Sequence, residues 1–307
     1  MKDSSAKRRQ LRVKLGEVVY RTGVFRLVLP GLNPNCGPVR RRLNDYLRHY
    51  LEEGGRMPAT LRLGPDRVRL RCDLNDHMLK PQLQGERGLY EEDDINHCAS
   101  FLRPGDVLID IGANHGFWGF LLAARQPEIG QLVAVEANPE LASRLRITKR
   151  LNPGIPTTIL EKAITSPGVE EVTFYLPMPN PVGNLSGLGS IVLHETAVEN
   201  QYLCRDQAIV CPAITLDALV DQLALKRVDL LKIDVEQAED LVIEGAHQVI
   251  QHLRPRLVMM ETGWNSQASR AMLEAGYRAH ILIDSMEPCS SIPEGYWGNI
   301  FFTTPSA

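Results

Sequence analysis

From about residue 88 onward, short apolar runs alternate with stretches in which apolar residues recur at helical spacing. The runs are typical of buried strands, and the stretches between them are typical of amphipathic helices. This alternation predicts an α/β fold with a mostly parallel, doubly wound sheet. The predicted strands cover 107–111, 131–136, 157–160, 171–175, 228–234, 256–261, 277–283 and 299–303, and the predicted helices cover 115–125, 139–151, 216–223, 238–253 and 267–275.

Two features of the pattern modify this sheet. Strands 277–283 and 299–303 follow each other without a helix between them, which predicts an antiparallel strand at the sheet edge. Residues 165–212 interrupt the alternation and contain, besides strand 171–175, a Gly-, Asn- and Ser-rich loop at 180–190. We expect substrate specificity to depend on this loop and on the N-terminal region.

Residues 1–87 lack the alternation. The first ten residues are polar and basic, a composition typical of disorder. An amphipathic helix is predicted at 39–53, and alternating charged and apolar residues at 59–72 predict a small antiparallel ribbon. A chain of 307 residues has room for one large domain and an extension, so we expect an N-terminal extension at 1–87 and an α/β domain at 88–307. The extension is expected to cover the active site or to form a homodimer contact.

Charge is divided unevenly between the two regions. The formal net charge is −3, but residues 1–60 contain 13 Lys and Arg against 5 Asp and Glu, a balance of +8, and the remainder has a balance of −11. A basic arm either binds an anionic partner or folds as a solvated face against the acidic domain. The second reading is favoured, and no specific nucleic-acid partner is expected.

The cysteines and the apolar stretches bear on the compartment. Six cysteines are scattered without C-x-x-C pairs or zinc-ligand spacing, which is typical of a reducing compartment. Residues 1–10 lack the apolar core of a signal peptide, and residues 18–32 are too short and too polar to span a bilayer. The sequence predicts a cytoplasmic protein without a transmembrane segment.

The segment 107–119, VLIDIGANHGFWG, carries the clearest chemical signal. An apolar run ends near Asp110, and Gly112 and Gly116 follow before an apolar helical stretch. Glycines permit a tight turn and let a ligand approach the backbone, while a helix start offers unpaired N–H groups. The segment therefore predicts a site for a nucleotide-like cofactor.

The residues around this turn distinguish between cofactors. A dinucleotide site uses G-x-G-x-x-G, but Asn114 occupies the middle glycine position. Asp110 would repel phosphate and suit a cationic amine, and Glu136 can accept hydrogen bonds from both ribose hydroxyls. A ligand with a ribose and an ammonium group but no phosphate is S-adenosyl-L-methionine, with S-adenosyl-L-homocysteine as its product.

Four predicted strands end in acids: Asp110, Glu136, Asp234 with the nearby Glu236, and Glu261. A buried carboxylate is unfavourable unless a partner satisfies it. A sulfonium, an ammonium and ribose hydroxyls are such partners, and ligands of open α/β sheets lie beyond the carboxyl ends of the strands. For Glu236 and Glu261 the alternative is that they cap helix N-termini.

The combination of VLIDIGANHG, LVAVEANPE, AITLDAL, VDLLKIDVEQAEDLVIEGA and RPRLVMMETG resembles the FkbM family of S-adenosylmethionine-dependent methyltransferases over residues 88–303. The resemblance implies a class I methyltransferase, Rossmann-like fold with a seven-stranded sheet, which acts mainly on hydroxyl oxygens of polyketides, sugars and related metabolites. One departure is Gln237, because the family usually has glycine after the KIDVE run. The cofactor contacts expected with this resemblance come from Asp110, Gly112, Ala113, Asn114, Gly116, Glu136, Asn138, Asp234 and the backbone near Ala163.

Four residues are candidates for the methyl-transfer chemistry. Asp234 is the leading candidate for the base, or for orienting the substrate, although a carboxylate beside a sulfonium has a lowered pKa and is a weaker base. Lys232 lies two residues earlier on the same strand face and would pair with Asp234 or Glu261. His194 and His115 are competing bases, with a surface role and a packing role as the respective alternatives. Nothing resembles metal-ligand spacing, so no metal is expected.

These observations predict an enzyme that methylates a free hydroxyl of a small metabolite, sugar, lipid or glycan by in-line transfer. One alternative is an NAD-linked or nucleotide-sugar oxidoreductase, against which Asn114 and Asp110 argue. Another is a non-catalytic adenosyl-binding scaffold, which would be expected to lose its strand-end acids. Protein or nucleic-acid methylation stays open because of the basic arm, although the fourth strand is followed by IDVE and not by an Asn-Pro-Pro-Tyr-type motif.

Overall fold

The computed structural model describes residues 10–11, 14–15, 46, 58–63, 68–73, 76, 90–177, 188–193, 203–283 and 287–305. The chain divides into two compact units. The first contains Met1–Thr60, Cys72–Tyr90 and Met178–Ser186, and the second contains Leu61–Arg71, Glu91–Pro177 and Gly187–Ala307. The domain boundary between residues 87 and 88 stays a prediction.

Two predictions concern the N-terminal region. Strands β1 (Pro58–Leu63) and β2 (Val68–Asp73) form a two-stranded sheet where the ribbon was expected at 59–72, and its antiparallel direction stays a prediction. The helix expected at 39–53 lies outside the described residues, apart from Tyr46.

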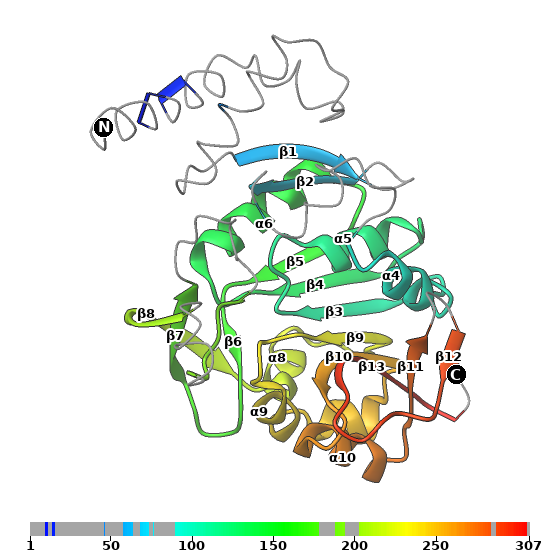
Figure 1. Ribbon diagram of the computed structural model, residues 1–307. Helices are drawn as coiled ribbons and strands as arrows, with labels where there is room; N and C mark the ends of the chain where they lie inside the picture. Colours follow the sequence, from blue (N-terminus) through cyan, green and yellow to red (C-terminus); the bar gives the residue numbers. More distant parts are fainter. Residues whose placement is uncertain are drawn as a thin grey trace. The chain divides into compact units, whose positions relative to one another are not determined.

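The second unit is built on an eight-stranded sheet with the order β12-β11-β13-β10-β9-β3-β4-β5 (Figure 1). Neighbours from β10 to β5 pair in parallel, as the alternating pattern predicts. The strand order reverses between β3 and β9, and ligands of such sheets bind beyond the carboxyl ends of the strands at this reversal. The strands are β3 (Val107–Ile111), β4 (Gln131–Val135), β5 (Thr157–Leu160), β9 (Leu230–Ile233), β10 (Leu257–Gly263), β11 (Arg278–Ile283), β12 (Glu287–Cys289) and β13 (Trp297–Thr303).

The last long strand is antiparallel, as predicted, but it does not lie at the sheet edge. Strand β13 pairs antiparallel with both β10 and β11, and the edge position is taken by β12, which adds an eighth strand to the expected seven. An interior position buries Ile300, Phe301 and Phe302 completely. Chain order alone does not reveal this insertion.

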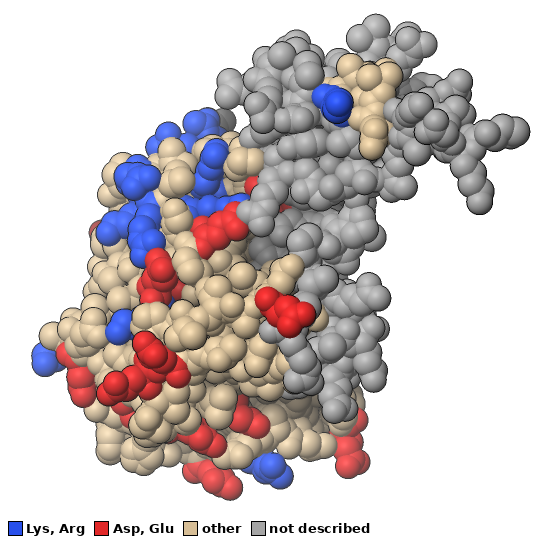
Figure 2. All heavy atoms as spheres, turned by 90° about the vertical axis from the view of Figure 1, so that its left-hand side faces the viewer, with Lys and Arg blue, Asp and Glu red and all other residues tan. Residues whose placement is uncertain are grey.

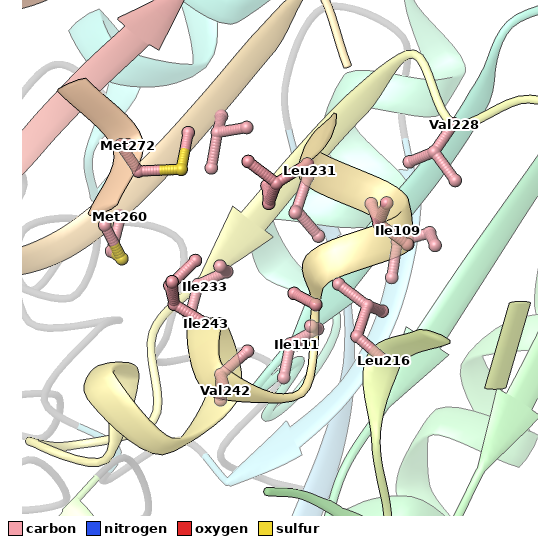
Figure 3. Packing of buried hydrophobic residues seen from close by; sticks show 14 of the residues in the cluster. Ile109, Ile111, Leu216, Val228, Leu231, Ile233, Val242, Ile243, Met260 and Met272 are labelled. Atoms are coloured by element: carbon pink, nitrogen blue, oxygen red, sulfur yellow. The ribbon is translucent and has the colours of Figure 1, made fainter. Parts of the chain in front are cut away.

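Helices cover both faces of the sheet (Figure 1). One face carries α4 (Glu92–Ala99), α5 (Phe117–Ala124) and α6 (Pro139–Leu151), and the other carries α8 (Leu216–Gln222), α9 (Glu239–Glu244), the π-helix η4 (Val249–Leu253) and α10 (Gln267–Glu274). The main apolar core joins the second group to the sheet, with Ile111 and Ile233 close to Val242 and Ile243 (Figure 3). The core therefore fixes β3 and β9, the strands next to the reversal, relative to each other.

The single helix predicted at 238–253 is wrong, because it breaks at Gly245. A Cβ at this position would lie 2.3 Å from the backbone O of Thr165, so only glycine allows this close approach. The Asp217 carboxylate caps the start of the second helical segment. It accepts hydrogen bonds from the amides of Gln248 and Val249 at 2.8 and 2.9 Å. The close approach of Gly245 to Thr165 and the hydrogen bonds to Asp217 all join residues far apart in sequence.

Residues 163–214, which include the interruption at 165–212, contain more strand than predicted. Strands β6 (Ala163–Ile164), β7 (Glu171–Pro177) and β8 (Leu203–Ile214) form a second sheet with the order β6-β8-β7. The prediction omits β8, which contains Pro212, a residue that usually argues against a strand. Most of the loop predicted at 180–190 lies outside the described residues.

Charges on the described surface are grouped by sign. Figure 2 shows Lys and Arg side chains gathered on one part of the visible face and Asp and Glu side chains on another. Helix α6 contributes the exposed basic residues Arg146, Lys149 and Arg150, so positive charge is not confined to residues 1–60. Within the described part of the chain, every helix is too short or too polar to cross a bilayer.

Candidate cofactor and acceptor site

The turn after β3 is built so that only glycine fits at its first position. Gly112 has a φ of +76°, and a Cβ added there would lie 1.8 Å from the backbone O of Asp234. The amides of Gly112 and Ala113 both donate to the backbone O of Val135 at 3.0 Å. Asn114 has a φ of 50°, a conformation that Asn adopts more readily than most residues. The turn therefore brings the carboxyl ends of β3, β4 and β9 together.

Glu136 links this turn to the start of α6. Its Oε2 accepts a hydrogen bond from the Asn114 amide at 2.7 Å, and its Oε1 accepts one from the Asn138 amide at 2.8 Å. Burial raises the pKa of Glu136 to about 7, although these amides lower it. Each oxygen has a second lone pair, so Glu136 can still accept hydrogen bonds from a ligand hydroxyl. Asn138 itself caps α6 by accepting a hydrogen bond from the Glu140 amide.

Asp110 lies beneath the turn and is almost completely buried. Its Oδ2 accepts a hydrogen bond from the Gly119 amide at 3.1 Å, whereas its Oδ1 has no hydrogen-bond partner among the described residues. Burial raises the pKa of Asp110 to about 6, and Lys232 opposes this rise. A buried acceptor without a donor is the kind of group that a cationic ligand atom would satisfy.

Lys232 is the buried cation of the site. It pairs in register with Asp110 on β3 and with Met259 on β10, and its Nζ donates to Asp234 Oδ2 at 2.7 Å. Burial alone would lower the pKa of Lys232, but the carboxylates of Asp234 and Asp110 raise it well above its usual value. The lysine is therefore a permanent positive charge between two strand-end acids, which agrees with the expected pairing to Asp234.

Two further acids surround Asp234. Burial, Asp234 and Glu261 raise the pKa of Glu236 to about 9, and burial and Asp234 raise the pKa of Glu261 to about 8. The nearby Asp234 carboxylate therefore favours the protonated form of Glu261. Neither acid caps the next helix by its side chain, because α9 has no side-chain cap and α10 begins on Ser266.

Glu239 is a functional-site neighbour that sequence reasoning missed. Its Oε1 accepts hydrogen bonds from the amides of Val235 and Gln237 at 3.1 and 3.2 Å. Burial raises its pKa to about 7. The available signal was an acidic residue in the first turn of a predicted helix, where acids often accept backbone hydrogen bonds.

The remaining candidates lie in different surroundings. Gly116 begins α5 with a φ of +83°, and Ala163 packs in an apolar cluster that includes Ala137, the residue after Glu136. His115 is buried and close enough to Glu136 to lower the pKa of that carboxyl. His194 lies outside the described residues. In the described ranges, no three His, Cys, Asp or Glu residues are grouped as metal ligands.

The residues present fit an adenosyl ligand with a positive charge. The lone pairs of Glu136 suit ribose hydroxyls, and the unpaired Oδ1 of Asp110 suits an ammonium donor or a water bound to it. The turn lacks the second glycine of a dinucleotide site, and Asn114 occupies that position. A pyrophosphate fits this surface less well, because it would face two carboxylates.

Comparison with known proteins decides the family. The family model "Methyltransferase FkbM domain" matches residues 110–279, which is more than half of the chain. The chain belongs to the FkbM methyltransferase family. This assignment supports S-adenosylmethionine as the cofactor and the class I methyltransferase fold expected from the sequence. No curated protein matches this chain.

The solved structures to which this chain shows similarity include three methyltransferases. The FkbM methyltransferase of Methylobacillus flagellatus has a TM-score of 0.39 and 12% identity, over 74% of this chain and 52% of its own. A precorrin-6y C5,15-methyltransferase of Geobacter metallireducens has a TM-score of 0.39 and 12% identity, over 70% and 90%. A putative methyltransferase of Streptococcus mutans has a TM-score of 0.42 and 9% identity, over 87% and 65%. This chain thus spans about half the length of the Methylobacillus protein.

We expect this FkbM-family protein, without added ligand, to lose stability as the pH rises from 6.5 to 9. The raised pKa values of Glu136, Glu239, Glu261 and Glu236, from about 7 to about 9, mean that the folded state binds more protons than the unfolded state in this window. The free energy of unfolding therefore falls with pH. Below pH 6.5 the lowered pKa of His280, about 4, acts in the opposite direction.

Chemical denaturation at several pH values would measure this dependence. Glu261→Gln should flatten the curve, because it removes one of the groups that loses a proton in the window. Glu274→Gln, which changes an exposed acid on α10, should leave the slope unchanged. A stability that rises between pH 6.5 and 9 would show that these carboxyls are not protonated in the folded protein.

Proposed function

We propose that this protein is an S-adenosylmethionine-dependent methyltransferase that methylates a hydroxyl oxygen of a small metabolite, sugar, lipid or glycan. The observation that carries the proposal is the position of Asp234. Its carbonyl packs on the Gly112 turn, and its carboxylate is a quarter exposed and held by Lys232. An acid at this place can meet an acceptor next to the cofactor turn.

The cofactor, when bound, supplies an electrophilic methyl group. Glu136 would hold the ribose, and Asp110 would face the cationic end of the ligand, directly or through water. Gly112, Ala113, Asn114 and Gly116 would provide the backbone surface, Asn138 donates to Glu136, and Ala163 packs in the cluster with Ala137. Most of the rate enhancement is then expected from alignment of the acceptor oxygen, which can contribute about 7–11 kcal/mol.

Asp234 would accept a hydrogen bond from the acceptor hydroxyl and take up its proton. Lys232 donates to Oδ2 of this carboxylate at 2.7 Å. This donor fixes the direction in which the remaining lone pairs of Asp234 point. Because Lys232 already holds the carboxylate, orientation of the hydroxyl is a larger part of the role of Asp234 than proton removal.

Thermal melts with S-adenosylmethionine, S-adenosylhomocysteine and NAD test the choice of cofactor. A ligand at a hundred times its dissociation constant stabilises the protein by about 2.7 kcal/mol, which raises the midpoint visibly. Glu136→Ala should weaken the response to both adenosyl ligands. Glu161→Ala, which removes the acid after the neighbouring strand β5, should not, because Glu161 pairs with Arg146 at the surface. A response to NAD alone would favour the oxidoreductase alternative.

Transfer of a labelled methyl group to a panel of hydroxylated and amine-containing acceptors tests the reaction. Asp234→Asn should lower kcat by about 10²-fold or more while it changes the affinity for S-adenosylhomocysteine much less. Labelling of amines alone would contradict O-methylation. Adenosyl binding without transfer to any class of acceptor would support the scaffold alternative.

A further inference from the structure

The backbone directly after Asp234 is strained. Glu236 has a φ of 53° and Gln237 a φ of 73°, so two consecutive residues with side chains adopt the left-handed conformation. Each such residue costs about 1–2 kcal/mol relative to right-handed backbone. Strain of this kind persists only where surrounding contacts enforce it, and it is concentrated at functional sites. The contacts that hold this turn in its strained conformation therefore bear on the function of the site.

Contacts hold the turn from two sides. On the amide side, Glu239 accepts the hydrogen bonds from Val235 and Gln237. On the carbonyl side, Ser190 Oγ donates to the backbone O of Glu236 at 2.6 Å. Ser190 is only 2% exposed, so this hydroxyl has little access to water as an alternative partner.

Ser190 is itself held by the second sheet. Its amide donates to Tyr175 O at 3.2 Å, its O accepts from the Tyr175 amide at 2.9 Å, and its Oγ accepts from the Val192 amide at 3.0 Å. Tyr175 belongs to β7. The serine hydroxyl therefore connects β7 to the turn that follows β9, across 46 residues of sequence.

The turn is also connected to the cofactor loop. The Asp234 amide donates to Ile111 O at 3.1 Å, and the Asp234 carbonyl lies where a side chain on Gly112 would be. A shift of the Glu236 carbonyl would move Asp234, and with it the surface on which Gly112 rests. We propose that Ser190 is a positioning residue for methyl transfer, which holds the left-handed Glu236–Gln237 turn and thereby sets Asp234 against the cofactor loop.

The proposal predicts an energetic coupling between Ser190 and Gln237. Glycine adopts the left-handed conformation without strain, so Gln237→Gly should make the turn less dependent on the serine hydroxyl. A double-mutant cycle would compare the wild-type protein, Ser190→Ala, Gln237→Gly and the double variant. Thr157→Val is the matched control, because it also removes a buried hydroxyl that donates to a backbone carbonyl, here at the amino end of β5.

Three measurements apply to each variant: the melting midpoint, hydrogen exchange of the amides of residues 235–239, and the affinity for S-adenosylhomocysteine. Ser190→Ala should increase exchange at Val235 and Gln237 and weaken S-adenosylhomocysteine binding by about tenfold, the effect of about 1.4 kcal/mol. Both changes should be smaller in the Gln237→Gly background. Thr157→Val should lower the midpoint without affecting exchange in the turn.

Equal exchange and affinity in the wild-type protein and Ser190→Ala would overturn the proposal, and so would an effect of the same size in both backgrounds. The inference rests on the proposed function only for its ligand readout. If the wild-type protein does not bind S-adenosylhomocysteine, the proposed cofactor is wrong. The exchange and melting data would then still decide whether Ser190 holds the turn.

Discussion

Gly112→Ala is expected to be the most damaging change of one methyl group among the described glycines. The added Cβ would lie 1.8 Å from the Asp234 carbonyl oxygen and 2.9 Å from its carbon, and real Cβ atoms do not approach other atoms this closely. The obstacle is backbone, which cannot rotate away as a side chain can. Strand β9 is fixed at this point by the hydrogen bond from the Asp234 amide to Ile111 O.

The expected loss of stability has two parts. Alanine in the left-handed conformation costs about 1–2 kcal/mol, and the displacement of β9 from β3 adds to this. Together they amount to several kcal/mol in a protein whose total stability is expected to be about 5–15 kcal/mol. Denaturant titration would measure the loss, and the affinity for S-adenosylhomocysteine should fall with it.

Gly168→Ala provides the control for the backbone part. Gly168 has a φ of +82°, but nothing lies within 4 Å of the position of its Cβ. It should therefore show the cost of left-handed alanine without the steric clash. If Gly112→Ala is no more destabilising than Gly168→Ala, the carbonyl of Asp234 does not lie against Gly112 in solution.

The elements that the sequence predicts well are those whose signals are local. Helix α6 begins and ends at the predicted residues because Asn138 caps it and Pro139 occupies its first position, and both are visible in the sequence. Strands β3 and β5 also have the predicted bounds, because each is a short run rich in β-branched residues between turn residues. Local chemistry and hydrophobic periodicity suffice in these cases.

The elements that the sequence predicts badly depend on contacts between distant residues. The break at Gly245 exists because Thr165 and Asp217 approach the helix there, and the interior place of β13 depends on its pairing with two strands at once. Periodicity carries no information about such neighbours. A helical pattern that continues through a glycine therefore reads as one helix.

The candidate site divides in the same way. Asp110, Glu136 and Asp234 could be predicted because parallel strands bring their carboxyl ends to one edge, so strand-end acids converge. The atoms to which each of these acids is hydrogen-bonded could not be predicted from the sequence. No sequence motif indicates that Ser190 contacts Glu236. The left-handed conformation of Gln237 could not be predicted either, because this conformation is expected of glycine.

Lys232→Met should destabilise the protein strongly and in a pH-dependent way. The Lys232 side chain is 7% exposed, and its charge interacts with the carboxylates of Asp110, Asp234 and Glu91. Removal of one partner from a buried charge cluster leaves the others uncompensated, which typically costs about 3–5 kcal/mol. Lys226→Met, which removes an exposed lysine just before β9, should have little effect.

The pH dependence follows from the sign of each interaction. Lys232 lowers the pKa of Asp110, Glu236 and Glu261, so its loss raises all three above values that are already about 6, 9 and 8. Protonation of these groups relieves the repulsion, so the loss of stability should be smaller at pH 5 than at pH 8. Asp234→Asn added to Lys232→Met should recover part of the loss at pH 8, because it removes one uncompensated charge. An equal loss at both pH values would mean that Lys232 contributes packing and not charge, and the argument that it holds Asp234 would then fail.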